Sequence, residues 1–305
     1  MNHFGFVFFV ILVIVLIAYG VYMYGLPPVS KSPVQNTQNS GSQGTTYAPG
    51  GTSGGAQSYG GTAGAPSTPP PSTCGQLNVS QYQMPQGFSI NDLSPCFGKI
   101  TISASPGYSG SYSQITIYSY LPSSAGKINI TGWLMKGNRG SQYVPQAVNV
   151  YQPSGLAPQS DIYVKNGDRV AIYSTQSAIG VNVRLNKCIG YVANANKFNP
   201  PLYLSCPYIS RSDIINFSGQ CQNYLMSLGN CQLPAANPPI PQNDYSCQAY
   251  INNLNYGGCF AKYSNDYDFL SNQWVAWSGS NFLDFQHDRL LLFDKQGLLV
   301  SEYAY

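Results

Sequence analysis

His287 is the residue best suited to proton transfer in this chain. It lies in the run from Asp284 to Arg289 (Asp-Phe-Gln-His-Asp-Arg), and the only other histidine is His3. An imidazole next to a carboxylate is the pairing that a hydrolase uses as a general base. The same run suits a polar loop that fixes the entry to the last strands through hydrogen bonds and an ion pair. Beyond residue 73 no Gly-x-Ser-x-Gly, His-Glu-x-x-His or phosphate-binding glycine motif accompanies it, so we expect no enzyme and no cofactor.

A second group with chemical potential is Asn265, Asp266 and Asp268, whose oxygens are of the type that Ca²⁺ prefers. Calcium takes six or more oxygen ligands, and the neighbouring sequence does not supply them. We therefore predict no metal.

The eight cysteines all lie beyond residue 73. They are Cys74, Cys96, Cys188, Cys206, Cys221, Cys231, Cys247 and Cys259. An even number confined to one part of the chain predicts disulfides and an oxidising, extracytoplasmic compartment. No pair has the spacing of zinc ligands. The spacing favours Cys74 with Cys96 and Cys188 with Cys206, and it leaves the pairing of the other four open.

Charge is unevenly distributed along the sequence. Residues 99–211 carry ten Lys or Arg against two Asp, whereas residues 212–305 carry three against eight acidic residues. The basic half suits an anionic partner such as a surface polymer, or the two halves neutralise each other within one domain. The expected contact residues are Lys127, Lys136, Arg139, Lys165 and Arg169. A net charge of +3 is too small to favour nucleic acid as the partner.

The elements that position these residues are mainly strands. Residues 127–134 alternate apolar and polar side chains and end in Gly-Trp, and residues 114–120 alternate in the same way. The predicted core residues are Ile115, Ile117, Ile128, Ile130 and Trp133. Gly132 lets the backbone bend so that Trp133 turns inward, which makes it the largest core anchor.

Two further β-rich stretches contain turn signals. Residues 161–174 are two runs around Asn166-Gly167, and residues 289–302 are two runs around the turn from Asp294 to Gly297, with apolar residues on both faces, as in interior strands. Together with the Gly-Trp strand, this pattern resembles the lamin-tail domain over about 98–187 and 274–305. The resemblance implies an immunoglobulin-like β-sandwich that serves in recognition or attachment, without a shared catalytic constellation.

A helical insertion interrupts this pattern. Cys221 and Cys247 each begin a copy of Cys-Gln-x-Tyr-aliphatic-x-x-Leu, whose apolar residues recur at helical spacing. Each copy ends in Gly before a second cysteine, at Gly229 and Gly258, which suits helix C-caps. A third helix is expected over 264–277, capped by Ser264.

The N-terminal part has a different composition. Residues 4–26 contain no charge and span about 34 Å as a helix, which is enough to cross a bilayer. Residues 27–73 are Gly, Ser, Thr, Pro, Gln and Asn with few large aliphatic residues, which is typical of a disordered tether. The predicted domains are therefore a transmembrane anchor (1–26), a linker (27–73) and an ectodomain (74–305).

The sequence thus predicts a mainly β chain: a lamin-tail-like sandwich with a small disulfide-bonded helical insertion over about 188–273, preceded by a transmembrane helix and a disordered linker. The expected location is the cell membrane, as a single-pass protein with its C-terminal domain outside the cytoplasm. The expected function is non-catalytic binding or adhesion to a surface polymer or surface protein. A structural envelope component and a hydrolase using His287 are the alternatives. The oligomeric state is left open.

Overall fold

The structure is a computed structural model that describes residues 74–305 except 78, 81–83, 108–110, 156–157 and 204. The described residues belong to one unit, Ala65–Tyr305. The predicted anchor and linker lie outside them. Within the described ranges no helix is long and apolar enough to cross a membrane. The predicted fold class is corrected accordingly: it included a transmembrane helix, none is found among the described residues, and its β-rich part alone agrees with the structure.

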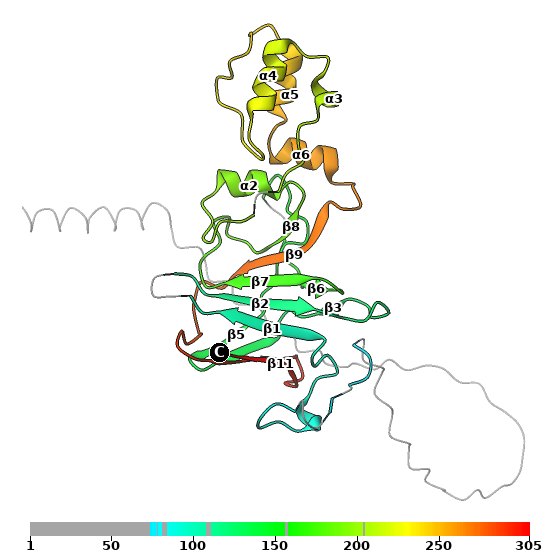
Figure 1. The fold of residues 1–305 in the computed structure, drawn as a ribbon, viewed down its shortest axis with the longest axis vertical. Coiled ribbons are helices and arrows are strands. Elements are labelled where there is room, and N and C mark those ends of the chain that lie inside the picture. The colour runs from blue at the N-terminus through cyan, green and yellow to red at the C-terminus, as the bar shows by residue number, and fades with distance from the viewer. Residues whose placement is uncertain (1–73, 78, 81–83, 108–110, 156–157, 204) are drawn as a thin grey trace, which may run out of the picture. The chain divides into compact units, whose positions relative to one another are not determined.

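Two main sheets and a strand pair form the β part (Figure 1). The first sheet has the order β1 (Ile100–Ser105), β2 (Gln114–Ser119), β7 (Arg169–Tyr173), β9 (Leu270–Trp277) and β8 (Val183–Asn186). The second has the order β11 (Leu299–Ala304), β10 (Arg289–Phe293), β4 (Leu134–Gly137) and β5 (Gly140–Tyr143). A short pair joins β3 (Ile128–Asn129) to β6 (Tyr163–Val164). A 3-10 turn, η2 (Ile90–Asp92), precedes β1.

The main core lies between the two sheets, and all five residues expected in it are buried. The exposed fractions are 4% for Ile115, 1% for Ile117, 7% for Ile128, 0% for Ile130 and 4% for Trp133. They share one apolar cluster with residues of both sheets. Gly132 has φ of +79°, a left-handed conformation that glycine adopts without strain and that lets the chain bend before Trp133.

The two turn signals lead to different connections. The turn from Asp294 to Gly297 joins β10 to its antiparallel partner β11, and the Asp294 carboxylate accepts the N–H groups of Gln296 and Leu298. The Asn166-Gly167 turn instead passes from β6, which pairs with β3, to β7, which pairs with β2. Of the two C-terminal strands, which were both expected in the interior, β10 is interior and β11 lies at the sheet edge beside β1.

Strand β9 corrects the prediction of a helix over 264–277. It runs parallel to β7 and antiparallel to β8, whereas both sheets of an immunoglobulin-like sandwich are antiparallel. Trp274 and Ala276 face the main core, and Val275 and Trp277 face a second apolar cluster. The aromatic spacing that suggested a helix therefore belongs to a strand buried on both faces, and Ser264 is the C-cap of the preceding helix.

The segment between β8 and β9 is helical. It contains α2 (Ile189–Ala195), α3 (Arg211–Ile214), α4 (Gly219–Ser227), α5 (Tyr245–Asn252) and α6 (Tyr256–Tyr263). The two copies of the cysteine repeat form α4 and α5, with Ser218 and Asp244 as their N-caps. The prediction that Gly258 is a helix C-cap is wrong, because Gly258 lies inside α6.

All eight cysteines form disulfides, and two of the bonds differ from the expected pairing. Cys74–Cys96 occurs as predicted. Cys188 pairs with Cys259 and Cys206 with Cys231, so the predicted Cys188–Cys206 bond is wrong; Cys221–Cys247 joins α4 to α5. Sequence separation favoured the nearer partner, but the arrival of α6 beside α2 places Cys259 next to Cys188. Four disulfides are typical of a domain from an oxidising, extracellular environment.

Tyr256 links α6 to the β part, and its removal gives a testable effect. Its hydroxyl donates to the Tyr151 carbonyl at 2.6 Å and accepts from Asn186 Nδ2 at 3.1 Å. Tyr256→Phe should lower the free energy of unfolding by about 1–3 kcal/mol, because both partners lose a hydrogen bond in a partly buried place. Urea denaturation at pH 7 measures this, with Tyr245→Phe, at a 75% exposed tyrosine, as the control.

The pH dependence of this link has a definite sign. Burial raises the pKa of Tyr256 from 10 to about 12. The pKa of Tyr256 is higher in the folded state than in the unfolded state. The free energy by which its protonated hydroxyl stabilises the fold is therefore fully present below pH 10 and is lost as the pH rises through 12. The wild type should lose more stability than Tyr256→Phe over this alkaline range. Equal losses of stability in the wild type and in Tyr256→Phe between pH 10 and 12 would contradict the proposed link. A Tyr256→Phe protein as stable as the wild type at pH 7 would contradict it as well.

Candidate binding site

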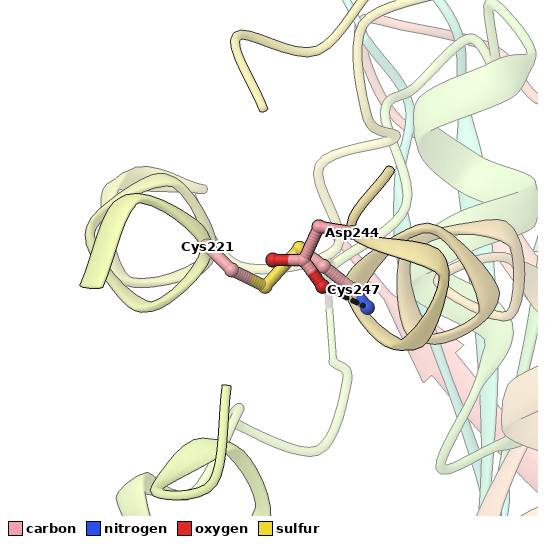
Figure 2. Close-up of side chains that lie close together, drawn as sticks. All are labelled: Cys221, Asp244 and Cys247. Atoms are coloured by element: carbon pink, nitrogen blue, oxygen red, sulfur yellow. Dashed lines mark hydrogen bonds between the residues drawn. A yellow bond between two sulfur atoms is a disulfide. The ribbon is translucent and has the colours of Figure 1, made fainter. Parts of the chain in front are cut away.

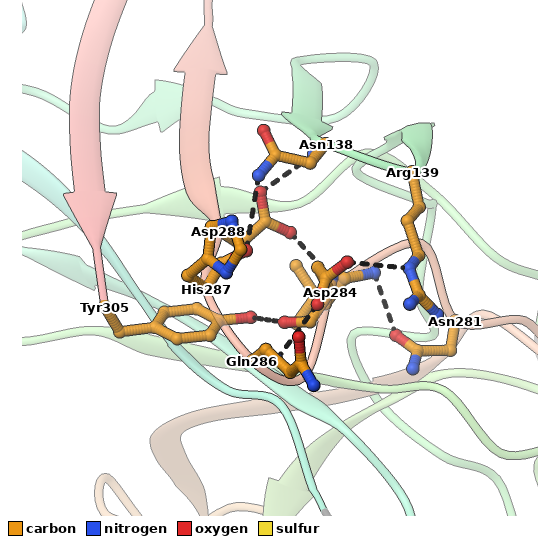
Figure 3. A network of polar contacts seen from close by, with 9 residues as sticks. Asn138, Arg139, Asn281, Asp284, Gln286, His287, Asp288 and Tyr305 are labelled. Carbon is orange, nitrogen blue, oxygen red and sulfur yellow. Dashed lines mark hydrogen bonds and ion pairs between the residues drawn. The ribbon is translucent and has the colours of Figure 1, made fainter.

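The His287 region is a hydrogen-bonded structural junction. Figure 3 shows the buried Asp288, whose carboxylate accepts the N–H groups of Asn138 at 2.8 Å and Asp284 at 2.9 Å. The Tyr305 hydroxyl donates to the Asp284 carbonyl at 2.5 Å. The Gln286 N–H and the Arg139 guanidinium lower the pKa of the Asp284 carboxyl. These contacts tie the β4–β5 turn to the chain before β10 and to the C-terminal residue.

His287 itself is exposed, and it is absent from the linings of the five hollows considered among the described residues. Its carbonyl accepts from the Asn138 side chain, while both neighbouring carboxylates are engaged by other donors. No hydroxyl nucleophile faces the imidazole among the contacts described for it. The geometry therefore lends no support to the hydrolase alternative at this residue.

The five predicted basic contact residues do not form one surface. Arg169 packs over Tyr118 at one end of β2, and Lys127 and Lys165 act electrostatically on Asp168 near that end. Arg139 pairs with Asp284 at 3.0 Å and lies over the Phe285 ring. Asp284 belongs to the opposite end, where Ser113, next to the start of β2, bonds Asn281.

Lys136 occupies a third position. It lines an open hollow of about 400 Å³ on the second sheet together with Tyr143, Lys295 and the carboxylate-bearing Asp294. Asp161 lies within electrostatic range of Lys295 as well. The mixture of charges gives this hollow little preference for an anion.

The charge asymmetry is partly neutralised inside the domain. Arg139 pairs with Asp284, and Lys187 pairs with Asp266 at 2.8 Å and with Asp268 at 2.6 Å, so residues of the basic half bind residues of the acidic half. Asp266 and Asp268, which the sequence offered as calcium ligands, both bind the ammonium of Lys187. Exposed pairs of this kind contribute about 0–1 kcal/mol each.

Cys221, Asp244 and Cys247 lie close enough together to suggest metal ligands (Figure 2). Their sulfurs form a disulfide with each other, and Asp244 accepts from the Cys247 N–H at 3.1 Å and from the Ser218 hydroxyl at 2.6 Å. These hydrogen bonds lower the pKa of Asp244, with the Ser218 bond as the largest cause. The cluster is a helix cap beside a disulfide.

One cavity in the helical insertion has largely aromatic walls, and we name it the tyrosine pocket. It has a volume of about 410 Å³. Its walls come from α2, from the segment 207–209 and from α5 and α6. The lining residues are Tyr191, Pro207, Tyr208, Ile209, Tyr250, Asn253, Leu254, Gly258, Cys259, Ala261, Lys262 and Tyr263. Aromatic walls with a few polar groups are typical of ligand sites of this size.

Local features of the chain fix these walls. Asn255 caps α6 by accepting the Gly258 N–H at 3.0 Å. A Cβ at Gly258 would lie 2.1 Å from the Asn253 carbonyl oxygen, so only glycine permits this close approach of α6 to the end of α5. The disulfides Cys188–Cys259 and Cys206–Cys231 hold α6 and the start of the 207–209 segment in place.

Titratable groups that line the tyrosine pocket act on one another electrostatically. Burial raises the pKa of Tyr191, and the nearby Tyr250 and Tyr263 contribute to the increase. Burial also raises the pKa of Tyr250. Lys262 pairs with Asp213 at 2.9 Å, and this hydrogen bond raises the pKa of Lys262. Perturbed titratable groups in a cavity favour a functional site.

Sequence patterns did not reveal this pocket. The repeat marks Tyr250 and its counterpart Tyr224, but only Tyr250 lines the pocket, while the Tyr224 hydroxyl accepts from the Ala235 N–H. No sequence motif includes Tyr191, Tyr208 or Tyr263. The abundance of tyrosine, 25 residues in the chain, was the one compositional signal for an aromatic binding surface.

Comparison with known proteins identifies no relative. No protein-family model matches the chain, and no curated protein and no solved structure is significantly similar to it. The resemblance to the lamin-tail domain therefore stays a prediction.

Proposed function

We propose that the chain is a non-catalytic binding module that acts outside the cytoplasm and recognises a surface polymer or another surface protein through the tyrosine pocket. The observation that carries this proposal is the pocket itself: four tyrosines from separate segments around a cavity of about 410 Å³. Tyrosine offers a large rigid apolar face and a hydroxyl, which is why it is enriched where proteins bind partners. The four disulfides favour the extracellular location.

The basic residues predicted as the contact set have a smaller role in this proposal. They lie at separate places, and Arg139 serves an ion pair and packs on Phe285. The resemblance to lamin-tail domains, which implies recognition or attachment, points to the same class of function without naming a ligand.

A structural envelope role is the second candidate. Tyr203, Tyr245 and Tyr267 are 84%, 75% and 101% exposed. Exposed aromatic side chains favour association between copies where they gather into one contiguous patch. Such a role predicts binding of the chain to itself that does not depend on the tyrosine pocket.

Filling the pocket tests the proposal. Ala261 on α6 lines the pocket and is exposed, so Ala261→Trp should occupy the cavity without removing a packed side chain. Retention of the full-length chain on immobilised neutral polysaccharides, polyanionic polysaccharides and the chain itself is the measurement. We expect at least one probe to retain the wild type and Ala261→Trp to bind it at least tenfold more weakly.

The matched control is Ala249→Trp, which places the same side chain at an exposed alanine of α5 outside the pocket. It should bind as the wild type does. No retention on any probe, or equal retention of both variants, would contradict the proposed function. Self-association that survives in Ala261→Trp would favour the structural role.

A further inference from the structure

Two hollows adjoin each other in the insertion. The second has a volume of about 150 Å³ and is lined by residues of α4 and of the chain that follows it. Both hollows share five lining residues: Tyr191, Pro207, Tyr208, Ile209 and Leu254. Tyr208 is 82% exposed although it borders both cavities. The 207–209 segment thus contributes to the walls of both hollows.

Neither hollow has an unpaired charged side chain among its lining residues. Lys262 is the one charged residue among the described residues that line the tyrosine pocket, and its ammonium is paired with Asp213. The second hollow has no charged residue among those that line it. Because Asp213 offsets the charge of Lys262, the pocket offers an anionic ligand little uncompensated positive charge.

The lining combines apolar faces with neutral hydrogen-bonding groups. Tyrosine hydroxyls, with Asn253 in the pocket and Asn230 and Gln232 in the second hollow, can donate and accept. Pro207, Ile209 and Leu254 supply apolar surface. A sugar ring matches this arrangement, because it has an apolar face of C–H groups and a rim of hydroxyls.

We propose that the insertion binds a neutral oligosaccharide chain, with successive sugar units in the two hollows and the Tyr208 ring as the platform between them. This inference rests on the proposed function and specifies its ligand. A proline-rich peptide also stacks on aromatic rings, but it has few donors to match the tyrosine and asparagine side chains among the lining residues. The division into two hollows favours a polymer of repeated units over a single small molecule.

The test uses calorimetric titration of the full-length chain with neutral β-1,4-linked glucose, mannose and N-acetylglucosamine oligomers of one to six units. Affinity for one series should rise with length until both hollows are filled. The affinity should change by less than twofold between 0.05 and 0.5 M salt, because a neutral oligosaccharide forms no ion pair that salt could screen. Tyr208→Ala should weaken binding of the longest oligomer at least tenfold.

Tyr203→Ala is the matched control, because Tyr203 is 84% exposed and lines neither hollow. It should bind as the wild type does. Two results would overturn the inference and leave the proposed function standing. One is binding that requires a polyanion. The other is binding of a proline-rich synthetic peptide, for which residues 65–73 serve as the probe, in place of the sugars. An oligosaccharide bound equally by Tyr208→Ala, or by Ala261→Trp, would overturn the inference as well, and the second result would also remove the proposed function.

Discussion

Trp133→Ala should lower the free energy of unfolding by about 3–5 kcal/mol, the usual cost of truncating a buried tryptophan. Trp133 is 4% exposed and belongs to the cluster that both sheets share. Its main-chain bonds to Ile130 and Val144 survive the substitution, so the loss comes from the cavity. Because domains are stable by only about 5–15 kcal/mol, this is a large fraction of the total.

Chemical denaturation followed by circular dichroism measures this loss. Trp133→Phe should retain more of the stability, since the smaller ring leaves a smaller cavity. Tyr143→Ala, on the neighbouring strand β5 and 68% exposed, is the surface control and should change stability little. A Trp133→Ala protein that unfolds at the same denaturant concentration as the wild type would contradict a core position for Trp133.

Removal of the Cys221–Cys247 bond by a double Cys→Ala change should unfold α4 and α5. The bond closes a separation of 26 residues, for which loop entropy predicts about 3–4 kcal/mol. The apolar cluster that it supports is small, with Ile214, Leu225 and Ile251 as its buried aliphatic residues. The tyrosine pocket would lose Tyr250 and Leu254, so binding should disappear with the helices.

The measurement separates the insertion from the sheets. Far-ultraviolet circular dichroism should lose helix signal, while the fluorescence of Trp133, Trp274 and Trp277, which lie outside the insertion, should keep its native wavelength. The control is the double Cys→Ala change at Cys74 and Cys96, which should leave the helix signal unchanged. Full helicity and unchanged binding without the Cys221–Cys247 bond would contradict the expectation that α4 and α5 depend on this disulfide.

The candidate site shows why function was harder to infer than strands. Tyr191, Tyr208, Tyr250 and Tyr263 are spread over more than 70 residues, and none belongs to a chemical motif. The basic residues looked like a set because they share a charge and a stretch of chain. Counts along the sequence could not show that Arg139 faces Asp284 or that Lys187 faces Asp266 and Asp268.

Local patterns determined the features that depend on neighbouring residues. Alternation placed Ile128 and Ile130 in the core, and the bend at Gly132 turned Trp133 inward. Asn166-Gly167 marked a turn, and the cysteine repeat marked α4 and α5. Side-chain periodicity and turn geometry are set within a few residues, so these features can be read from the sequence.

Tertiary structure decided which of these elements meet. Residues 264–277 have aromatic spacing that fits a helix, yet the gap between β7 and β8 takes Leu270–Trp277 as a strand, where Trp274 and Trp277 are buried on opposite faces. The same arrangement carries α6 next to α2, pairs Cys188 with Cys259, and closes the tyrosine pocket. Burial of apolar surface between distant segments sets these contacts, and this free energy depends on the whole fold and not on local sequence.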